Sequence, residues 1–258
     1  MKSKIYFAGA VLCACLVLFS GFMVFRHYAN DRQYTQEFDE LAEVVQQNQA
    51  KDDPTMPTDV PLTEEETVLP DYAELYLQNG DLVGWLSIEG PTINYPVMQT
   101  PDRPDYYLRR NFEKQSSDYG TPYAAEDCDI FPTSDNIVIY GHHIKNGKMF
   151  GALMDYTDKV FYEQHKTIRF DTLLDYGEYE IVAVFKTVAY TEAGFPYYRF
   201  IDAEGEDDFD AYIAECKRLS LYDTGVSAEY GDKLITLSTC EYSRTNGRLV
   251  VVAKRIAE

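Results

Sequence analysis

Short runs of apolar and β-branched residues recur along most of the chain, and Gly, Pro, Asn or Asp bounds several of them. Runs of this length and composition predict β-strands rather than helices. A succession of short strands with few helices between them favours a closed or nearly closed β-barrel, so we expect a mostly β fold. The predicted strands are LVGWLSI, INYPVMQ, GTPYAA, NIVIYG, TIRF, YEIVAVFKTVAY, KLITLSTC and RLVVVAKRI.

Three other segments show the spacing of an amphipathic helix, with apolar residues three and four positions apart. They are EFDELAEVV, KMFGALMDY and DDFDAYIAECKRLSLY, and the last of them lies before the strand KLITLSTC. Cys216 falls on the apolar face of this last helix, which predicts a core position. A further short helix, YAELYLQ, is expected to end at Asn79-Gly80, because Gly commonly follows a helix C-terminus.

The chain begins with an apolar segment that is long enough to cross a bilayer. Residues 5–25 contain no charged side chain, and about 20 apolar residues span a membrane as a helix. Lys2 and Lys4 precede this segment, which predicts a cytoplasmic N-terminus and an extracytoplasmic remainder. A cleaved signal peptide and a lipoprotein cleavage site in the sequence LCAC are the alternatives to an uncleaved, single-pass anchor.

Between this anchor and the strands lies a segment with few large apolar residues. The sequence QQNQAKDDPTMPTDVPLTEEETVLP is rich in proline, acidic and amide residues, which predicts an extended acidic linker. The chain is therefore expected to consist of a cytoplasmic N-terminus (residues 1–4), a transmembrane anchor (5–25), an extracytoplasmic helix and linker (26–69) and a folded domain (70–258).

Charge and cysteine content exclude several classes of function. The formal net charge is −20, from 43 acidic and 23 basic residues, which argues against a nucleic acid as partner. Five cysteines are too few for a disulfide framework, and two of them lie in residues 5–25. A bond between Cys128 and Cys216 stays open, and the sequence indicates neither a metal site nor a cofactor.

Two strand ends carry the residues with reactive side chains. The strand NIVIY runs into Gly141, His142 and His143, although such a histidine pair also occurs in solvated turns. Cys240 ends the strand LITLSTC, where it is either a buried structural thiol or a nucleophile. A nucleophilic thiolate needs a basic or cationic neighbour, and His142 could be that neighbour. Arg248 could stabilise an oxyanion or lie on the surface at the start of a strand.

These motifs resemble those of the sortase family, and specifically of class B. TLSTC matches the family's TLxTC strand, the pair Gly247-Arg248 opens the next strand, and YGHH followed by NGKMF matches the upstream strand end. The similarity extends over residues 81–256. It implies a sortase-like closed barrel of about eight strands, with N-terminal helices and a helix inserted before the strand that ends in cysteine.

The resemblance also implies roles for individual residues. Cys240 would be the nucleophile that forms a thioester with the threonine of a sorting signal, and His142 would be the acid–base group. Arg248 would stabilise the oxyanion or the bound peptide, and His143 would have a supporting role. The residues expected to contact the substrate are Asn94, Met98, Tyr140, Ser238 and Glu241.

Together with the predicted anchor, this resemblance implies a membrane-anchored cysteine transpeptidase of the bacterial cell surface. Its partners would be secreted proteins with a C-terminal sorting signal, and an amine of peptidoglycan or of its lipid-linked precursor would accept them. There are two alternatives. One is a pilin-polymerising sortase, in which a pilin lysine supplies the amine, and the other is a non-catalytic, membrane-tethered binding module.

Overall fold

The computed structural model describes most of the chain, which divides into two compact units, Met1–Glu43 and Val44–Glu258. The boundary falls within the first helix, and the second unit contains every strand of the described part. The described residues are 2–50, 60–63, 66–90 and 93–257, without the side chains of residues 2–5, 7–12, 14 and 27.

Helix α1 runs without interruption from Lys2 to Ala50. It includes residues 37–45, for which the sequence predicts a helix, and continues into the start of the predicted linker. The predicted transmembrane segment, residues 5–25, contains several residues whose side chains lie outside the described part. Within the described part of the chain, no helix has both the length and the apolar character that a membrane span requires.

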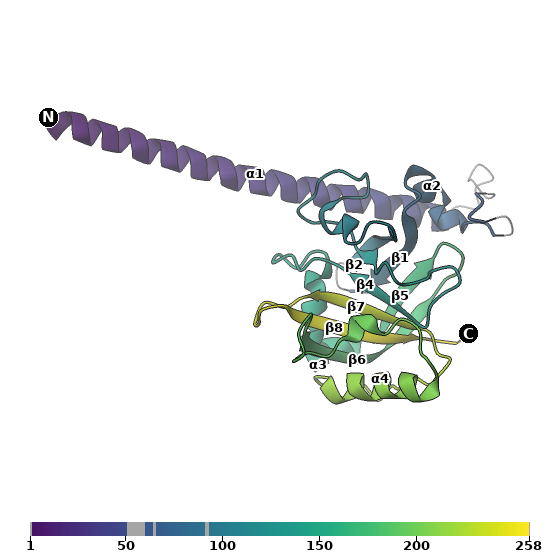
Figure 1. The fold of residues 1–258 in the computed structure, drawn as a ribbon. Helices are drawn as coiled ribbons and strands as arrows, with labels where there is room; N and C mark the ends of the chain where they lie inside the picture. Colours follow the sequence, from purple (N-terminus) through teal and green to yellow (C-terminus); the bar gives the residue numbers. More distant parts are fainter. Residues whose placement is uncertain (1, 51–59, 64–65, 91–92, 258) are drawn as a thin grey trace. The chain divides into compact units, whose positions relative to one another are not determined.

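Eight strands close into a barrel, which confirms the predicted fold class (Figure 1). Their order around the barrel is β1-β2-β3-β4-β7-β8-β6-β5. Neighbours are antiparallel except for two parallel pairs, β2 with β3 and β4 with β7. The strands are β1 (Leu82–Ile88), β2 (Ile93–Met98), β3 (Tyr123–Ala124), β4 (Asn136–Tyr140), β5 (Thr167–Thr172), β6 (Glu178–Val188), β7 (Leu234–Cys240) and β8 (Gly247–Arg255).

The parallel pairing of β4 with β7 is fixed by a buried amide. Asn136 is 0% exposed, and its Oδ1 accepts a hydrogen bond from Thr236 Oγ1 at 2.8 Å. Its Nδ2 donates to the Phe200 carbonyl at 2.7 Å. A buried polar group that lost these partners would be left unsatisfied, so the amide favours the register in which Tyr140 lies opposite Ser238.

Short helices connect the strands, and α4 (Glu206–Leu219) is the helix that the sequence predicts before β7. α2 (Pro70–Gln78) confirms the helix expected before Asn79. The segment KMFGALMDY is helical too, but its main part folds as a 3₁₀-helix rather than an α-helix. The remaining short helices are η1 (Tyr106–Arg109), η2 (Phe150–Thr157), α3 (Lys159–Gln164) and η3 (Tyr197–Arg199).

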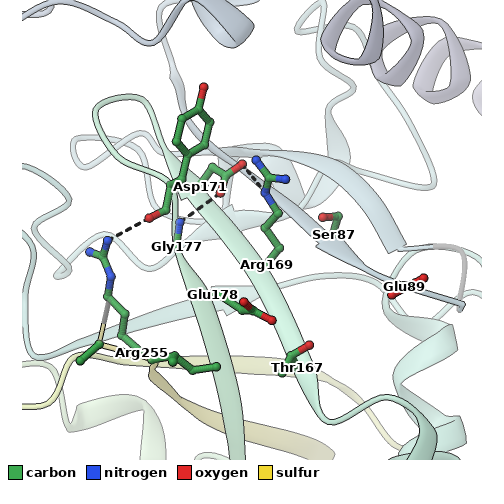
Figure 2. Close-up of a pocket in the computed structure, with 11 residues that line it drawn as sticks. Ser87, Glu89, Thr167, Arg169, Asp171, Gly177, Glu178 and Arg255 are labelled. Atoms are coloured by element: carbon green, nitrogen blue, oxygen red, sulfur yellow. Dashed lines mark hydrogen bonds and ion pairs between the residues drawn. The ribbon is translucent and has the colours of Figure 1, made fainter. Parts of the chain in front are cut away.

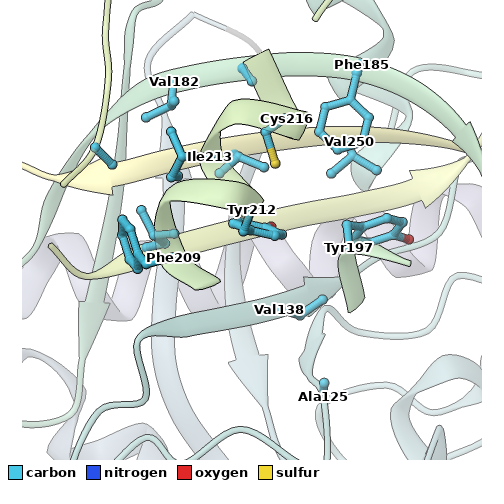
Figure 3. Packing of buried hydrophobic residues seen from close by; sticks show 14 of the residues in the cluster. Ala125, Val138, Val182, Phe185, Tyr197, Phe209, Tyr212, Ile213, Cys216 and Val250 are labelled. Atoms are coloured by element: carbon cyan, nitrogen blue, oxygen red, sulfur yellow. The ribbon is translucent and has the colours of Figure 1, made fainter. Parts of the chain in front are cut away.

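The predicted apolar face of α4 is buried against β6 and β8 (Figure 3). Phe209 and Cys216 on this face are each 0% exposed, and they pack in one cluster with Phe185 and Val250. Burial of a phenylalanine side chain such as that of Phe209 contributes about 1.5–3 kcal/mol. The prediction of a core position for Cys216 is therefore confirmed.

The open question of a disulfide between Cys128 and Cys216 is answered by their free thiols. Both residues are unbonded and buried. Burial raises the pKa of each thiol to about 12, and the thiolate is the reactive form of cysteine. These two cysteines are therefore structural.

Part of the predicted linker packs as part of the folded domain. Val60 and Val68 are 7% and 1% exposed, and Val68 N donates to the Val60 carbonyl at 2.8 Å. Leu69 N donates to the Leu173 carbonyl at 2.7 Å. The ordered packing thus begins ahead of Pro70. Residues 51–59 and 64–65 of the predicted linker lie outside the described residues.

We expect Leu237→Ala to lower the free energy of unfolding by about 2–5 kcal/mol, because the change leaves a cavity. Leu237 lies in the middle of β7 and is 0% exposed. Leu77→Ala is the matched control, because Leu77 is 65% exposed on α2 and should change stability by less than about 0.5 kcal/mol. Urea denaturation of the two variants measures both effects, and equal losses would contradict the assigned packing.

Candidate active site

Cys240 and Arg248 lie opposite each other at one end of the barrel, where β7 ends and β8 begins. They are partners in the antiparallel register, so their side chains lie on the same face. Glu241 N donates to the Gly247 carbonyl at 2.9 Å, which makes 241 and 247 a hydrogen-bonded pair. Hydrogen-bonded and non-hydrogen-bonded pairs alternate, so Cys240 and Arg248 form the closer, non-hydrogen-bonded kind.

The end of β4 lies beside the end of β7. Gly141 N donates to the Ser238 carbonyl at 3.2 Å, and Thr239 Oγ1 donates to the Gly141 carbonyl at 2.8 Å. The two histidines that follow Gly141 therefore lie next to the end of the cysteine strand. Thr239 thus has a direct structural role in the TLSTC motif, because its hydroxyl ties this strand to the histidine segment.

Both glycines of the sequence motifs are sites of close approach. A Cβ on Gly141 would lie 2.5 Å from Cγ of Phe150, a distance that side chains do not tolerate. A Cβ on Gly247 would overlap the carbonyl oxygen of Glu241. The packing of the YGHH and Gly-Arg motifs thus requires glycine at these two positions.

The imidazole of His142 is directed at η1. Its Nε2 donates to the Leu108 carbonyl at 2.6 Å. Burial lowers the pKa of His142 below its ordinary value, and the nearby Arg109 acts in the same direction, while the bond to Leu108 opposes it. A neutral imidazole with its proton on Nε2 has its lone pair on Nδ1. No hydrogen bond joins this imidazole to the Cys240 thiol in the described part of the chain.

The second histidine, His143, contacts the cysteine residue itself. Its Nδ1 donates to the backbone carbonyl of Cys240 at 2.7 Å. Its ring lies 4.9 Å from the ring of Tyr242, centroid to centroid. From the resemblance we expected only a supporting role for His143. In the structure its side chain bonds the backbone of Cys240, the candidate nucleophile.

Arg248 lies among tyrosines. Its Cζ is 5.8 Å from the ring centroid of Tyr190, which is within the range of a cation–π interaction. Burial raises the pKa of Tyr197 to about 12, although the positive charge of Arg248 acts against this shift. The hydroxyl of Tyr197 is 2.6 Å from Ser238 Oγ. A cation therefore lies on the same face of the sheet as the cysteine, where negative charge could develop during acyl transfer.

The residues predicted to contact a substrate differ in their accessibility. Tyr140 is half-buried, with its ring 5.5 Å from that of Tyr123. Asn94 is exposed, and its Oδ1 accepts a hydrogen bond from Trp85 Nε1 at 2.7 Å. Met98 is 0% exposed. Tyr140 and Asn94 thus offer surface to a ligand, whereas Met98 offers none.

Ser238 and Glu241 are already engaged in contacts within the protein. Ser238 is 1% exposed beneath Tyr197. The carboxylate of Glu241 accepts hydrogen bonds from Ser243 N at 3.1 Å and from Ser243 Oγ at 2.5 Å. Lys186 Nζ lies 3.4 Å from the same carboxylate. The Ser243 bonds and Lys186 lower the pKa of Glu241, against the effect of burial. Glu241 therefore stabilises the turn between β7 and β8.

A surface cavity of about 690 Å³ lies elsewhere, along β1, β5, β6 and the end of β8 (Figure 2). Its lining contains none of the predicted site residues. The Asp171 carboxylate in it accepts hydrogen bonds from Arg169 Nε at 2.8 Å and Gly177 N at 3.1 Å. The hydroxyl of Tyr72 also donates to it at 2.5 Å. The Asp171 carboxylate is thus satisfied by partners within the protein.

Sequence reasoning did not identify four residues that surround the predicted catalytic groups. Leu108 acts through its backbone carbonyl, for which a sequence carries no signal. Tyr190, Tyr197 and Tyr242 lie outside the recognised motifs, and the only sequence signal for them is the abundance of tyrosine, with 22 residues. Their positions became evident only from the folded arrangement around Arg248 and His143.

Comparison with known proteins identifies the family of this chain. A family model described as a sortase domain matches residues 86–256. Sortase B of Staphylococcus aureus (strain NCTC 8325 / PS 47) is 32% identical over 248 residues, which cover 95% of this chain and 94% of that protein.

Solved structures extend the similarity to the fold. A Staphylococcus aureus sortase B–substrate complex has a TM-score of 0.76 and 31% identity, covering 88% of this chain and 98% of that one. A sortase B complexed with triglycine has a TM-score of 0.74 and 30% identity, covering 88% and 98%. This chain belongs to the sortase family, as a cysteine transpeptidase of the sortase B type.

Proposed function

We propose that this transpeptidase cleaves a C-terminal sorting signal after its threonine and transfers the secreted protein to a peptidoglycan amine. The observation that carries the proposal is the register pairing of Cys240 with Arg248, beside the histidine-bearing end of β4. The similarity to a sortase B that was solved as a complex with its substrate also supports the proposal.

In the proposed reaction Cys240 is the nucleophile. Its thiolate attacks the threonine carbonyl carbon, so that a C–S bond forms and the carbonyl oxygen takes the electron pair. Collapse of this intermediate breaks the C–N bond, and His142 protonates the leaving amine with the proton that came from the thiol. The acceptor amine then attacks the thioester, the C–S bond breaks, and the proton of the amine returns to the thiol.

The proposed acid–base step requires a hydrogen bond between His142 and the thiol of Cys240. In the described part of the chain Nε2 of His142 donates to the Leu108 carbonyl, and no hydrogen bond joins this imidazole to the thiol. Catalytic hydrogen bonds often form only in the Michaelis complex. The lowered pKa of His142 favours a neutral imidazole at neutral pH, which is the form that accepts the thiol proton.

The proposed substrate contacts begin with Tyr140 and Asn94, because these side chains have accessible surface. Met98, Ser238 and Glu241 remain predictions, and each would have to act after a rearrangement or through a neighbour. The similarity to a sortase B solved with triglycine supports an amine of a glycine-containing peptide as the acceptor.

Localisation to the cell surface is part of the proposal. The uncharged segment 5–25 and the preceding Lys2 and Lys4 support a single-pass anchor with a cytoplasmic N-terminus. The catalytic domain would then lie outside the membrane, where secreted proteins and the peptidoglycan precursor are both available.

Cys240→Ala should abolish cleavage of quenched fluorescent peptides that carry candidate sorting signals with a scissile Thr–X bond. The reason is that no other thiol of the folded domain is accessible, since Cys128 and Cys216 are buried. Cys216→Ala serves as the control and should still cleave. Peptide cleavage by Cys240→Ala at the wild-type rate, or no cleavage of any such peptide by the wild type, would refute the proposed activity.

Arg248→Lys should lower kcat by about 100-fold with little change in KM, because a flexible ammonium does not reproduce the guanidinium donors at the developing oxyanion. Arg218→Lys is the matched control, since Arg218 lies on α4 and pairs with Glu215 at 2.6 Å. Steady-state kinetics with the same peptides measures both variants. An unchanged kcat in Arg248→Lys would remove this arginine from the proposed mechanism.

The full-length chain should fractionate with membranes and resist extraction by alkaline carbonate, whereas a variant without residues 1–25 should be released. Protease added to intact spheroplasts should digest the domain, because the proposal places it outside. The intact mass of the membrane form should include residues 1–25, which distinguishes an anchor from a cleaved signal peptide. Extraction of the full-length chain by carbonate would contradict the anchor.

A further inference from the structure

The backbone carbonyl of Cys240 is held by a side chain rather than by a neighbouring strand. Cys240 and Arg248 form a non-hydrogen-bonded pair, so this carbonyl points away from β8 and toward β4. The ladder between these strand ends continues as far as the bond from Gly141 N to the Ser238 carbonyl, at 3.2 Å. The next acceptor along β7 is the Cys240 carbonyl, and His143 Nδ1 donates to it at 2.7 Å.

The peptide plane that follows Cys240 is therefore held at both ends. Its carbonyl accepts from His143, and its N–H, which belongs to Glu241, donates to the Gly247 carbonyl at 2.9 Å. A peptide unit is rigid and planar, so these two bonds together fix its orientation. The orientation of this plane sets the ψ torsion of Cys240. It therefore sets the direction in which the side chain that bears the thiol projects from the backbone.

His143 is itself held by contacts with Met149 and Tyr242. Its backbone forms an antiparallel bridge with Met149, and the hydroxyl of Tyr242 donates to its carbonyl at 3.3 Å. The Tyr242 ring also lies against the imidazole, at 4.9 Å between centroids. The end of β4 and the turn after β7 thus hold each other reciprocally, through two side chains and two carbonyls.

The chemistry of the contact specifies the proton position. A carbonyl oxygen only accepts hydrogen bonds, so Nδ1 of His143 must carry a proton. Asparagine has its amide nitrogen on Cγ, at the position of Nδ1, whereas the amide nitrogen of glutamine lies one bond further out. Asparagine can therefore replace this donor, and glutamine or leucine cannot.

We propose that His143 is a positioning residue, which fixes the peptide plane after Cys240 and thereby aims the thiol at the scissile carbonyl. This inference rests on the proposed role of Cys240 as nucleophile. His143 acts through the backbone and takes no part in proton transfer, which distinguishes it from His142. A misplacement of a reacting atom by about 1 Å can cost about 100-fold in rate.

Steady-state kinetics of three variants of the full-length chain in detergent tests the proposal. The variants are His143→Leu, His143→Gln and His143→Asn. With a cleaved sorting-signal peptide, the Leu and Gln variants should lose about 10- to 100-fold in kcat with KM within about twofold. The Asn variant should stay within about threefold of the wild type. Melting temperatures identify any variant that fails to fold. If the Leu variant does not fold, the comparison of the Gln variant with the Asn variant still tests the proposal.

Two measurements need no peptide substrate. Deuterium uptake at residues 241–246 should be faster in the Leu and Gln variants and unchanged in the Asn variant, because the lost bond frees this turn. Strand β1 is the internal reference. The second measurement is the rate at which iodoacetamide alkylates Cys240, followed on the tryptic peptide 234–244. In the Leu and Gln variants this rate should differ from that of the wild type by less than about twofold, because the reaction with a small reagent does not depend on the direction of the thiol.

The outcomes separate this inference from the proposed function. The inference is overturned if Asn is as impaired as Gln, or if Gln changes neither kcat nor deuterium uptake. A fall in alkylation as large as the fall in kcat would also overturn it, because His143 would then act on the thiol's proton. If the wild type cleaves no peptide, the proposed function fails, whereas deuterium uptake still decides whether His143 holds the turn.

Discussion

The parallel pairing of β4 with β7 is the constraint on which the rest of the structure depends. Parallel neighbours cannot be joined by a hairpin and need a long crossover, which here contains β5, β6 and α4. The pair is held in register by the buried amide of Asn136, which bonds Thr236 on the partner strand and the Phe200 carbonyl beyond it. A slip of one residue would turn Cys240 to the opposite face of the sheet.

From this pairing the site follows almost entirely through backbone geometry. The pairing of β4 with β7 places His142 and His143, which follow β4, beside the end of β7. Arg248 on β8 lies opposite Cys240 in the antiparallel pair. Each group comes from a strand end rather than a long loop, so rigid elements set their separation. The imidazoles then contact carbonyls, His142 at Leu108 and His143 at Cys240. The site thus combines the proposed nucleophile and a cation, both on paired strands, with a proposed acid–base histidine that bonds a carbonyl instead of the thiol.

The strands, and the positions of the motifs at their ends, were predictable because their signals are local. Apolar runs with β-branched residues identify β4, β7 and β8. Gly141 and Gly247 are visible in the sequence motifs because the packing at these two positions has no room for a Cβ atom. The contacts of each side chain were not predictable, because they come from distant segments. The burial of Met98, the hydrogen bond of Ser238 to Tyr197 and the engagement of Glu241 with Lys186 all depend on such contacts. Similarly, the spacing of apolar residues in KMFGALMDY did not distinguish the 3₁₀ geometry of η2 from that of an α-helix.

The most direct test of the account is the intact mass of the enzyme during turnover of a sorting-signal peptide. The account predicts a covalent adduct equal to the part of the peptide up to and including threonine, located on the tryptic peptide 234–244 that contains Cys240. Hydroxylamine should remove this adduct, as expected of a thioester. Peptide cleavage without such an adduct, or an adduct on any other residue, would contradict the assignment of Cys240 as the nucleophile.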